Sequence, residues 1–74
     1  MSTFPSLTAK AVVQIIQKLG FIKVRQKGSH VFFSHQDGRT TVVPMHAGRN
    51  IGKGLLHSIL HEIQISPEEF NKLR

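Results

Sequence analysis

Apolar residues recur at two different periods along the chain, and the period predicts where helices and strands lie. Helical intervals of three and four residues come first, at Val12, Ile15, Ile16 and Leu19. This stripe predicts an amphipathic helix that begins near Thr8 as its N-cap and ends at Gly20. From Phe21 to Lys27 the period drops to two, which predicts a strand, and Gly28 and Ser29 interrupt it.

Two further strands are predicted around a tight turn. Strand-forming residues run from His30 to His35 and from Arg39 to Met45, and Asp37-Gly38 between them is the dipeptide most typical of a hairpin. If the turn holds two residues, one face carries the pairs Ser34 and Thr41, Phe32 and Val43, and His30 and Met45. The other face then carries Val31, Phe33, His35, Thr40, Val42 and Pro44.

Both faces of this hairpin contain apolar residues, so the pattern does not decide which one is the core. The face that no helix covers is either a binding surface or a moderately apolar surface without a partner. Phe32 and Phe33 could stack RNA bases, but adjacent strand residues face opposite ways, so at least one of them is expected in the core.

Helical spacing returns after the sheet, at Leu55, Leu56, Ile59, Leu60 and Ile63. It predicts a second long helix. Ser66 and Glu69 form a capping box with Pro67 at the first helical position, which predicts a short last helix that returns Phe70 and Leu73 to the core.

This order of elements predicts a single two-layer α+β domain over residues 1–74. A helix precedes a three-stranded antiparallel sheet, a helix and a short C-terminal helix follow, and the helices cover one face of the sheet. Helix, three strands, helix is also the order of a double-stranded-RNA-binding domain. With 74 residues the chain can bury one small core and is too short for a cofactor-binding fold with a separate substrate domain.

Charge then points to a class of partner. The chain has 10 Lys and Arg against 4 Asp and Glu, a formal charge of +6, which attracts polyanions and favours nucleic acid. The alternative is surface charge that only keeps a small protein dissolved. Lys23, Arg25 and Lys27 alternate along the first predicted strand, which would align them on one face or edge of the sheet. That alignment is also typical of an edge strand kept polar against aggregation.

Several chemistries are excluded or weakened by composition. With no cysteine, disulfides and cysteine-ligated zinc are excluded, and a reducing compartment suits the chain. Met1 is followed by no signal-peptide pattern, and no apolar run reaches membrane-spanning length, so we expect a soluble cytoplasmic protein without a membrane partner. His57 and His61 could form half a metal site, but a third ligand is not evident, so a solvated helix face is favoured and no metal or other cofactor is expected.

Residues 48–54, GRNIGKG, resemble a phosphate-binding loop between a strand and a helix. The segment is one residue short and lacks the Ser or Thr that binds magnesium, so nucleotide hydrolysis is not predicted. Its backbone amides and Lys53 could still contact an RNA phosphate at a helix N-terminus.

Several short motifs occur together along the chain: Gly20-Phe21, Gln26-Lys27-Gly28-Ser29-His30, His35 with Asp37-Gly38, Val43-Pro44 with His46, Gly54-Leu55-Leu56 and Ser58-Ile59-Leu60. In this combination the chain resembles the HicA family, small mRNA interferases of bacterial or archaeal toxin–antitoxin pairs. The resemblance covers roughly Thr8 to Phe70. It departs from the family at Leu55 and His57, where a threonine and an arginine are common, and this would remove a capping hydrogen bond and one phosphate contact.

The resemblance implies that His30 is the catalytic residue of a metal-independent endoribonuclease, the toxin of a type II pair. A neutral imidazole can take the proton of a ribose 2′-hydroxyl, which then attacks its own phosphate. We expect RNA contacts from Arg25, Lys27, Ser29, Arg49 and Lys53, with Gly28 and His46 as auxiliary residues. In the predicted register His46 lies opposite Ser29 and points away from His30 unless a bulge turns it.

The resemblance also implies two macromolecular partners, single-stranded mRNA and a HicB-type antitoxin that covers His30 and the basic strand. The alternative function is a non-catalytic RNA-binding module with the same layout, which would need basic and hydroxyl contacts but no histidine at this place. A protein-interaction domain with incidental basic charge is a weaker alternative.

Overall fold

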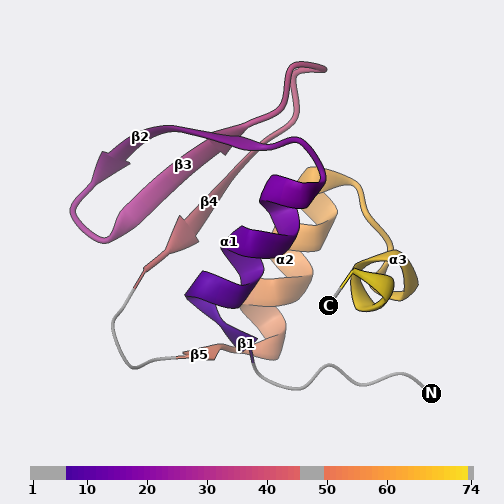
Figure 1. Cartoon of the computed structure of the whole chain (residues 1–74). Helices are drawn as coiled ribbons and strands as arrows, with labels where there is room; N and C mark the ends of the chain where they lie inside the picture. The colour runs from indigo at the N-terminus through magenta and orange to yellow at the C-terminus, as the bar shows by residue number, and fades with distance from the viewer. Residues whose placement is uncertain (1–6, 46–49, 74) are drawn as a thin grey trace.

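The computed structural model describes residues 7–45 and 50–73, and its elements follow the predicted order (Figure 1). They are β1 (Leu7–Thr8), α1 (Ala9–Lys18), β2 (Ile22–Lys27), β3 (His30–Ser34), β4 (Thr40–Pro44), β5 (Asn50–Ile51), α2 (Lys53–Ile63) and α3 (Pro67–Lys72). Strands β2, β3 and β4 form an antiparallel sheet in that order. The predicted α+β class with a three-stranded antiparallel sheet is therefore confirmed.

The first helix begins where the sequence predicts it. The Thr8 hydroxyl accepts a hydrogen bond from the Ala11 amide at 3.1 Å, which satisfies one of the otherwise unpaired donors of the first turn. The short strand β1 just before it pairs with β5, with Leu7 opposite Ile51. This pair was not predicted, and it brings the start of α1 beside the start of α2.

The register of the β3–β4 hairpin differs from the prediction by one residue. His35 and Arg39 close a three-residue loop, in which the His35 amide donates to the Arg39 carbonyl at 2.8 Å and the Gly38 amide donates to the His35 carbonyl at 2.9 Å. Gly38 has φ +101°, a conformation suited to the last loop position of such a turn. The predicted two-residue turn is wrong because the loop includes one more residue, and every pair moves by one.

The corrected register decides which face is the core. Val31 pairs with Val43 and Phe33 pairs with Thr41, and all four side chains are buried. They pack with the buried stripes of both long helices, where the core residues are Val12, Ile15, Ile16, Leu56, Ile59, Leu60 and Ile63. The opposite, outer face carries His30, Phe32, Ser34, Thr40, Val42 and Pro44. Val43 and Thr41 were predicted to lie on the same face as Phe32, but they lie on the opposite face, in the core.

A bulge in β2 separates the basic residues that were predicted to align. Lys23 pairs with Phe33 and Arg25 pairs with Phe32, so Val24 is an extra residue between two successive pairs. Because directly paired residues of an antiparallel sheet point to the same face, Lys23 lies on the core side and Arg25 on the outer face. The predicted alignment of Lys23 with Arg25 and Lys27 is therefore wrong.

The C-terminal elements follow the prediction closely. The buried stripe of α2 is the predicted one except for Leu55, which is 40% exposed. The Ser66 hydroxyl accepts from the Glu69 amide at 3.2 Å, and α3 returns Phe70 to the core as a fully buried side chain. Within residues 7–45 and 50–73, none of the helices has the length and apolar character needed to cross a bilayer.

Candidate active site

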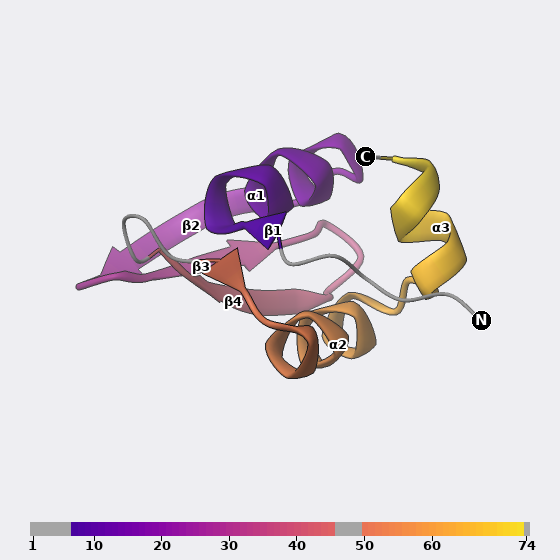
Figure 2. The same cartoon turned by 90° about the horizontal axis from the view of Figure 1, so that it is seen from below.

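His30 stands at the end of the sheet that projects farthest from the helices. It is the first residue of β3, and both views show the β2–β3 turn extending beyond the ends of α1 and α2 (Figures 1 and 2). It pairs with Lys27 on one side and with Pro44 on the other, and its side chain is exposed on the outer face. His30 is therefore held by strands on both sides while its side chain stays accessible.

The turn that places His30 is tight and well anchored. Gly28 and Ser29 are the two residues between the paired Lys27 and His30, and Gly28 has φ +59°, which a two-residue hairpin turn needs. The Ser29 carbonyl accepts a hydrogen bond from the Met45 amide at 2.6 Å, which ties the turn to the end of β4. The backbone around the candidate catalytic residue is thus held by its neighbours on both sides.

Two cations share the outer face with His30. Lys27 pairs directly with His30, and Arg25 pairs with Phe32 two residues farther along β3. The Arg25 guanidinium carbon lies 4.4 Å from the centre of the Phe32 ring, a cation–π contact that orients the guanidinium over the strand. An anionic group that approached His30 would therefore meet positive charge from β2.

Lys23 and Gln26 support the same turn from the core side. The Lys23 ammonium donates to the Gln26 side-chain oxygen at 3.0 Å, and the Gln26 side-chain nitrogen donates to the Gly28 carbonyl at 3.0 Å. This chain of hydrogen bonds bridges the β2 bulge and the turn. Lys23 is thus placed to stabilise the turn, whereas Arg25 and Lys27 face outward.

The structure brings together only part of the predicted site. Arg25, Lys27 and His30 share one end of the outer face, with Gly28 and Ser29 in the turn between the last two. Lys53 is exposed at the first position of α2, and both views separate the start of that helix from the β2–β3 turn (Figures 1 and 2). The predicted residues His46 and Arg49 lie outside the described residues.

A polar cluster that the sequence did not predict lies at the other end of the sheet, around the β3–β4 loop. His35 Nε2 lies 3.1 Å from the Leu19 carbonyl oxygen at the end of α1, and His35 Nδ1 lies 3.1 Å from the Asp37 amide. Arg39 donates to both carboxylate oxygens of Asp37 and, at 2.6 Å, to the Ile63 carbonyl at the end of α2. One sequence feature could have indicated this cluster: His35, Asp37 and Arg39 alternate around the turn, which places three polar side chains on one side of the loop.

This cluster has a structural character. The fully buried Phe21 ring packs against it. The centre of this ring lies 5.1 Å from the centre of the His35 ring and 5.2 Å from the guanidinium carbon of Arg39. The hydrogen bonds from Arg39 hold the pKa of Asp37 below its ordinary value of 3.8. The Arg39 guanidinium is paired with Asp37 and donates to the Ile63 carbonyl at the end of α2. Because its charge is already compensated there, Arg39 contributes little attraction for an outside anion.

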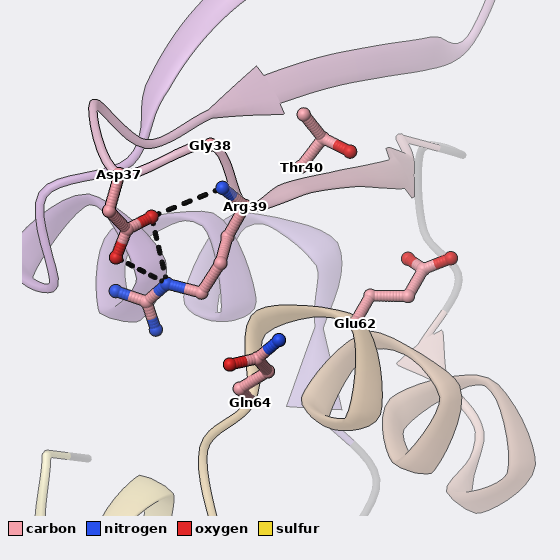
Figure 3. A pocket seen from close by; sticks show the side chains of 6 residues that line it. All are labelled: Asp37, Gly38, Arg39, Thr40, Glu62 and Gln64. Carbon is pink, nitrogen blue, oxygen red and sulfur yellow. Dashed lines mark hydrogen bonds and ion pairs between the residues drawn. The ribbon is translucent and has the colours of Figure 1, made fainter.

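The hollow beside this loop is acidic rather than basic (Figure 3). It measures about 570 Å³ and is lined by Asp37, Gly38, Arg39, Thr40, Glu62 and Gln64. Glu62 also accepts a hydrogen bond from the buried Thr41 hydroxyl at 2.6 Å. Asp37 lies at this loop, and Glu62 lies between the two ends of the sheet, because it also lines the groove beside Arg25 and Phe32. Lys27 and Arg25 supply positive charge toward the His30 end, so an anionic ligand is attracted there rather than to the loop. Among residues 7–45 and 50–73, no three His, Cys, Asp or Glu side chains are grouped so that they could hold a metal ion.

Comparison with known families agrees with this arrangement of elements. The family model described as "HicA toxin of bacterial toxin-antitoxin" matches residues 9–65, which is more than half of the chain. The chain belongs to the HicA toxin family. This membership confirms the resemblance of its motifs, and the HicA match runs from α1 through α2 and ends before α3. No curated protein matched the chain in the comparison.

Proposed function

We propose that this HicA-family toxin is an mRNA endoribonuclease and that His30 is its catalytic residue. The observation that carries the proposal is the position of His30 on an outer sheet face, directly paired with Lys27 and two residues from the Arg25–Phe32 pair. An imidazole there can act as a general base beside positive charge that holds a phosphate. The substrate itself supplies the nucleophile, so the protein does not have to position an attacking water.

The reaction follows from these groups. The His30 imidazole takes the proton of the ribose 2′-hydroxyl, the 2′-oxygen forms a bond to the adjacent phosphorus, and the bond from phosphorus to the 5′-oxygen breaks. The leaving 5′-oxygen takes a proton from the imidazolium or from water. The products are a 2′,3′-cyclic phosphate and a 5′-hydroxyl end. Lys27 and Arg25 stabilise the charge that builds on the phosphate oxygens, and Ser29 is a candidate hydrogen-bond donor to them.

The partners in this proposal are single-stranded mRNA and a HicB-type antitoxin. Lys53, exposed at the start of α2, and Arg49 are candidate contacts for RNA beyond the cleaved phosphate. The antitoxin is proposed to cover His30, Arg25 and Lys27 and to inhibit by excluding RNA. Membership of a toxin–antitoxin family supports a proteinaceous partner, and the basic end of the sheet supports an acidic one.

The experiment is cleavage of single-stranded RNA in excess EDTA, with analysis of the product ends. The parent is expected to cut and to leave 5′-hydroxyl ends, and His30→Ala is expected to cut about 10²- to 10⁴-fold more slowly while remaining folded by circular dichroism. The matched control is His61→Ala, which removes an exposed histidine of α2, away from the sheet end that carries His30. Cleavage that stops with EDTA and returns with zinc or magnesium would reject the mechanism. A folded parent that binds RNA without cutting it would favour the non-catalytic RNA-binding module.

A further inference from the structure

Phe32 is an aromatic side chain on the wrong side of the sheet for packing. Its neighbour Phe33 is 2% exposed in the core, whereas Phe32 points to the outer face and is only half-buried. On that face it pairs with Val42 on β4, and the Arg25 guanidinium carbon lies 4.4 Å from its ring centre. An aromatic ring that stays partly exposed to solvent, with a cation over it, has a geometry that flat aromatic ligands can use.

The outer face is hollowed at this place. A groove of about 330 Å³ lies here, and eight residues line it: Val24, Arg25, Phe32, Phe33, Thr40, Thr41, Val42 and Glu62. Phe32 and Val42 give it apolar surface, and its two charged lining residues are Arg25 and Glu62, one of each sign. Val24, the extra residue of the β2 bulge just before Arg25, also lines this groove.

The groove lies next to the candidate catalytic residue on the same strand. His30 and Phe32 are two residues apart on β3 and face the same side, so their Cα atoms are separated by about 7 Å in extended backbone. A nucleotide whose phosphate reached His30 and Lys27 would therefore bring its own base, or its neighbour's, to the groove. Lys27 is then positioned at the phosphate region, and Arg25, which pairs with Phe32, at the base region.

We propose that this groove binds one unpaired nucleobase of the RNA, stacked on the Arg25–Phe32 pair. The inference rests on the proposed function and names a base-binding subsite beside His30. Bases of single-stranded RNA stack on aromatic rings and on guanidinium planes, and every base has the π-face that this requires. A base within a duplex already has both faces stacked, so the subsite selects single-stranded RNA. Phe32 acts in binding and positioning and takes no part in proton transfer.

The test measures binding, so that it does not depend on cleavage. The probe is a short single-stranded oligonucleotide in which every ribose carries a 2′-O-methyl group, which removes the attacking hydroxyl. Fluorescence anisotropy gives its Kd for the parent and for each variant. Phe32→Leu is expected to weaken binding by about 5- to 100-fold, the loss of one base-stacking contact. Phe32→Tyr keeps an aromatic face and is expected to restore most of the affinity.

Two further variants separate stacking from charge and from general loss of apolar surface. Arg25→Lys keeps the positive charge but loses the planar guanidinium, so it is expected to weaken binding without changing the salt dependence. Ile22→Ala removes a side chain that is 64% exposed on the same strand and does not line the groove, and it is expected to bind as the parent does. Equal Kd values for Phe32→Leu and the parent would overturn the subsite.

One measurement on the unchanged protein guards against a variant that fails to fold. With ¹³C-labelled phenylalanine, addition of the oligonucleotide is expected to shift the ring resonances of Phe32 and to leave those of the buried Phe70 in place. Unchanged Phe32 resonances in the bound protein would overturn the proposal. A Phe32→Leu protein that binds the oligonucleotide normally but no longer binds its antitoxin would assign the groove to the protein partner instead. Failure of the parent to bind or cut any RNA would reject the proposed function itself, which is a different result.

Discussion

His35 Nε2 lies 3.1 Å from the carbonyl oxygen of Leu19, and this contact joins the tip of the β3–β4 hairpin to the end of α1. Because a carbonyl oxygen can only accept, Nε2 is the donor in this bond, and the other ring nitrogen, Nδ1, lies 3.1 Å from the Asp37 amide nitrogen and 3.0 Å from an Asp37 carboxylate oxygen. The side chain is mostly buried, with Phe21 packed against its ring. Because Arg39 makes the equivalent link to the end of α2, the loop is attached to both long helices.

Gly20 leaves the space that this histidine needs. A Cβ at position 20 would lie 2.9 Å from His35 Nε2, and Gly20 has φ +100°, which side-chain-bearing residues rarely adopt. We expect Gly20→Ala to lower the free energy of unfolding by about 1 to 3 kcal/mol in urea denaturation. Gly54→Ala is the matched control, since it lies within α2 with open space at its Cβ position, and it is expected to stabilise by about 0.5 to 1 kcal/mol. Equal effects of the two substitutions would contradict the contact.

The Asp37 carboxylate makes stability depend on acid pH. Its pKa is lowered in the folded protein, chiefly by the side-chain hydrogen bond from Arg39, so its contribution is fully present above its ordinary value of 3.8 and is lost as pH falls through the lower folded value. We expect Asp37→Asn to be less stable than the parent at pH 7 and to approach it as pH falls below 3.8 and through the lowered pKa of the folded Asp37 carboxyl. Thermal unfolding at several pH values measures the difference. Parallel pH profiles for parent and variant would show that the ion pair contributes nothing.

Phe70 tests the helix that lies beyond the family match. Its side chain is fully buried, and α3 follows the last matched residue, Ile65. We expect Phe70→Ala to cost about 3 to 5 kcal/mol, a large share of the roughly 5 to 15 kcal/mol typical of a domain. Lys72→Ala, on an exposed position of the same helix, is expected to change stability by no more than about 0.5 kcal/mol. A small loss for Phe70→Ala would mean that α3 is dispensable to the core.

The basic end of the sheet predicts how the antitoxin associates. If an acidic partner docks over Arg25 and Lys27, the association rate should fall as salt rises, since screening weakens electrostatic steering. Replacing both residues by Ala should slow association at low salt and flatten the salt dependence in stopped-flow measurements. Lys10→Ala, which removes one exposed charge from α1, is a control for net charge. An unchanged rate for the double variant would place the partner on another surface.

The sequence by itself determined those parts of the fold that depend on local interactions. The helical stripes, the Thr8 and Ser66 caps and the interruption of the strand run at Gly28-Ser29 all formed as predicted, because capping bonds and amphipathic periods involve residues within a few positions of each other. The family motifs also sufficed to place the chain among HicA toxins. Leu55 was misplaced in the core because an apolar residue at helical spacing can still lie at the edge of the buried stripe.

Only the tertiary structure decided the faces of the sheet and the composition of the site. The loop contains one residue more than predicted and is held by the backbone bonds between His35 and Arg39. Because side chains alternate at every residue of a strand, this shift moved Val43 and Thr41 to the face opposite the predicted one. In the same way the bulge at Val24 separated Lys23 from Arg25. Alternation makes sequence pattern ambiguous when both faces carry apolar residues, and packing against two distant helices resolves the ambiguity. Phe33 entered that core, and Phe32 was left on the outer face beside His30.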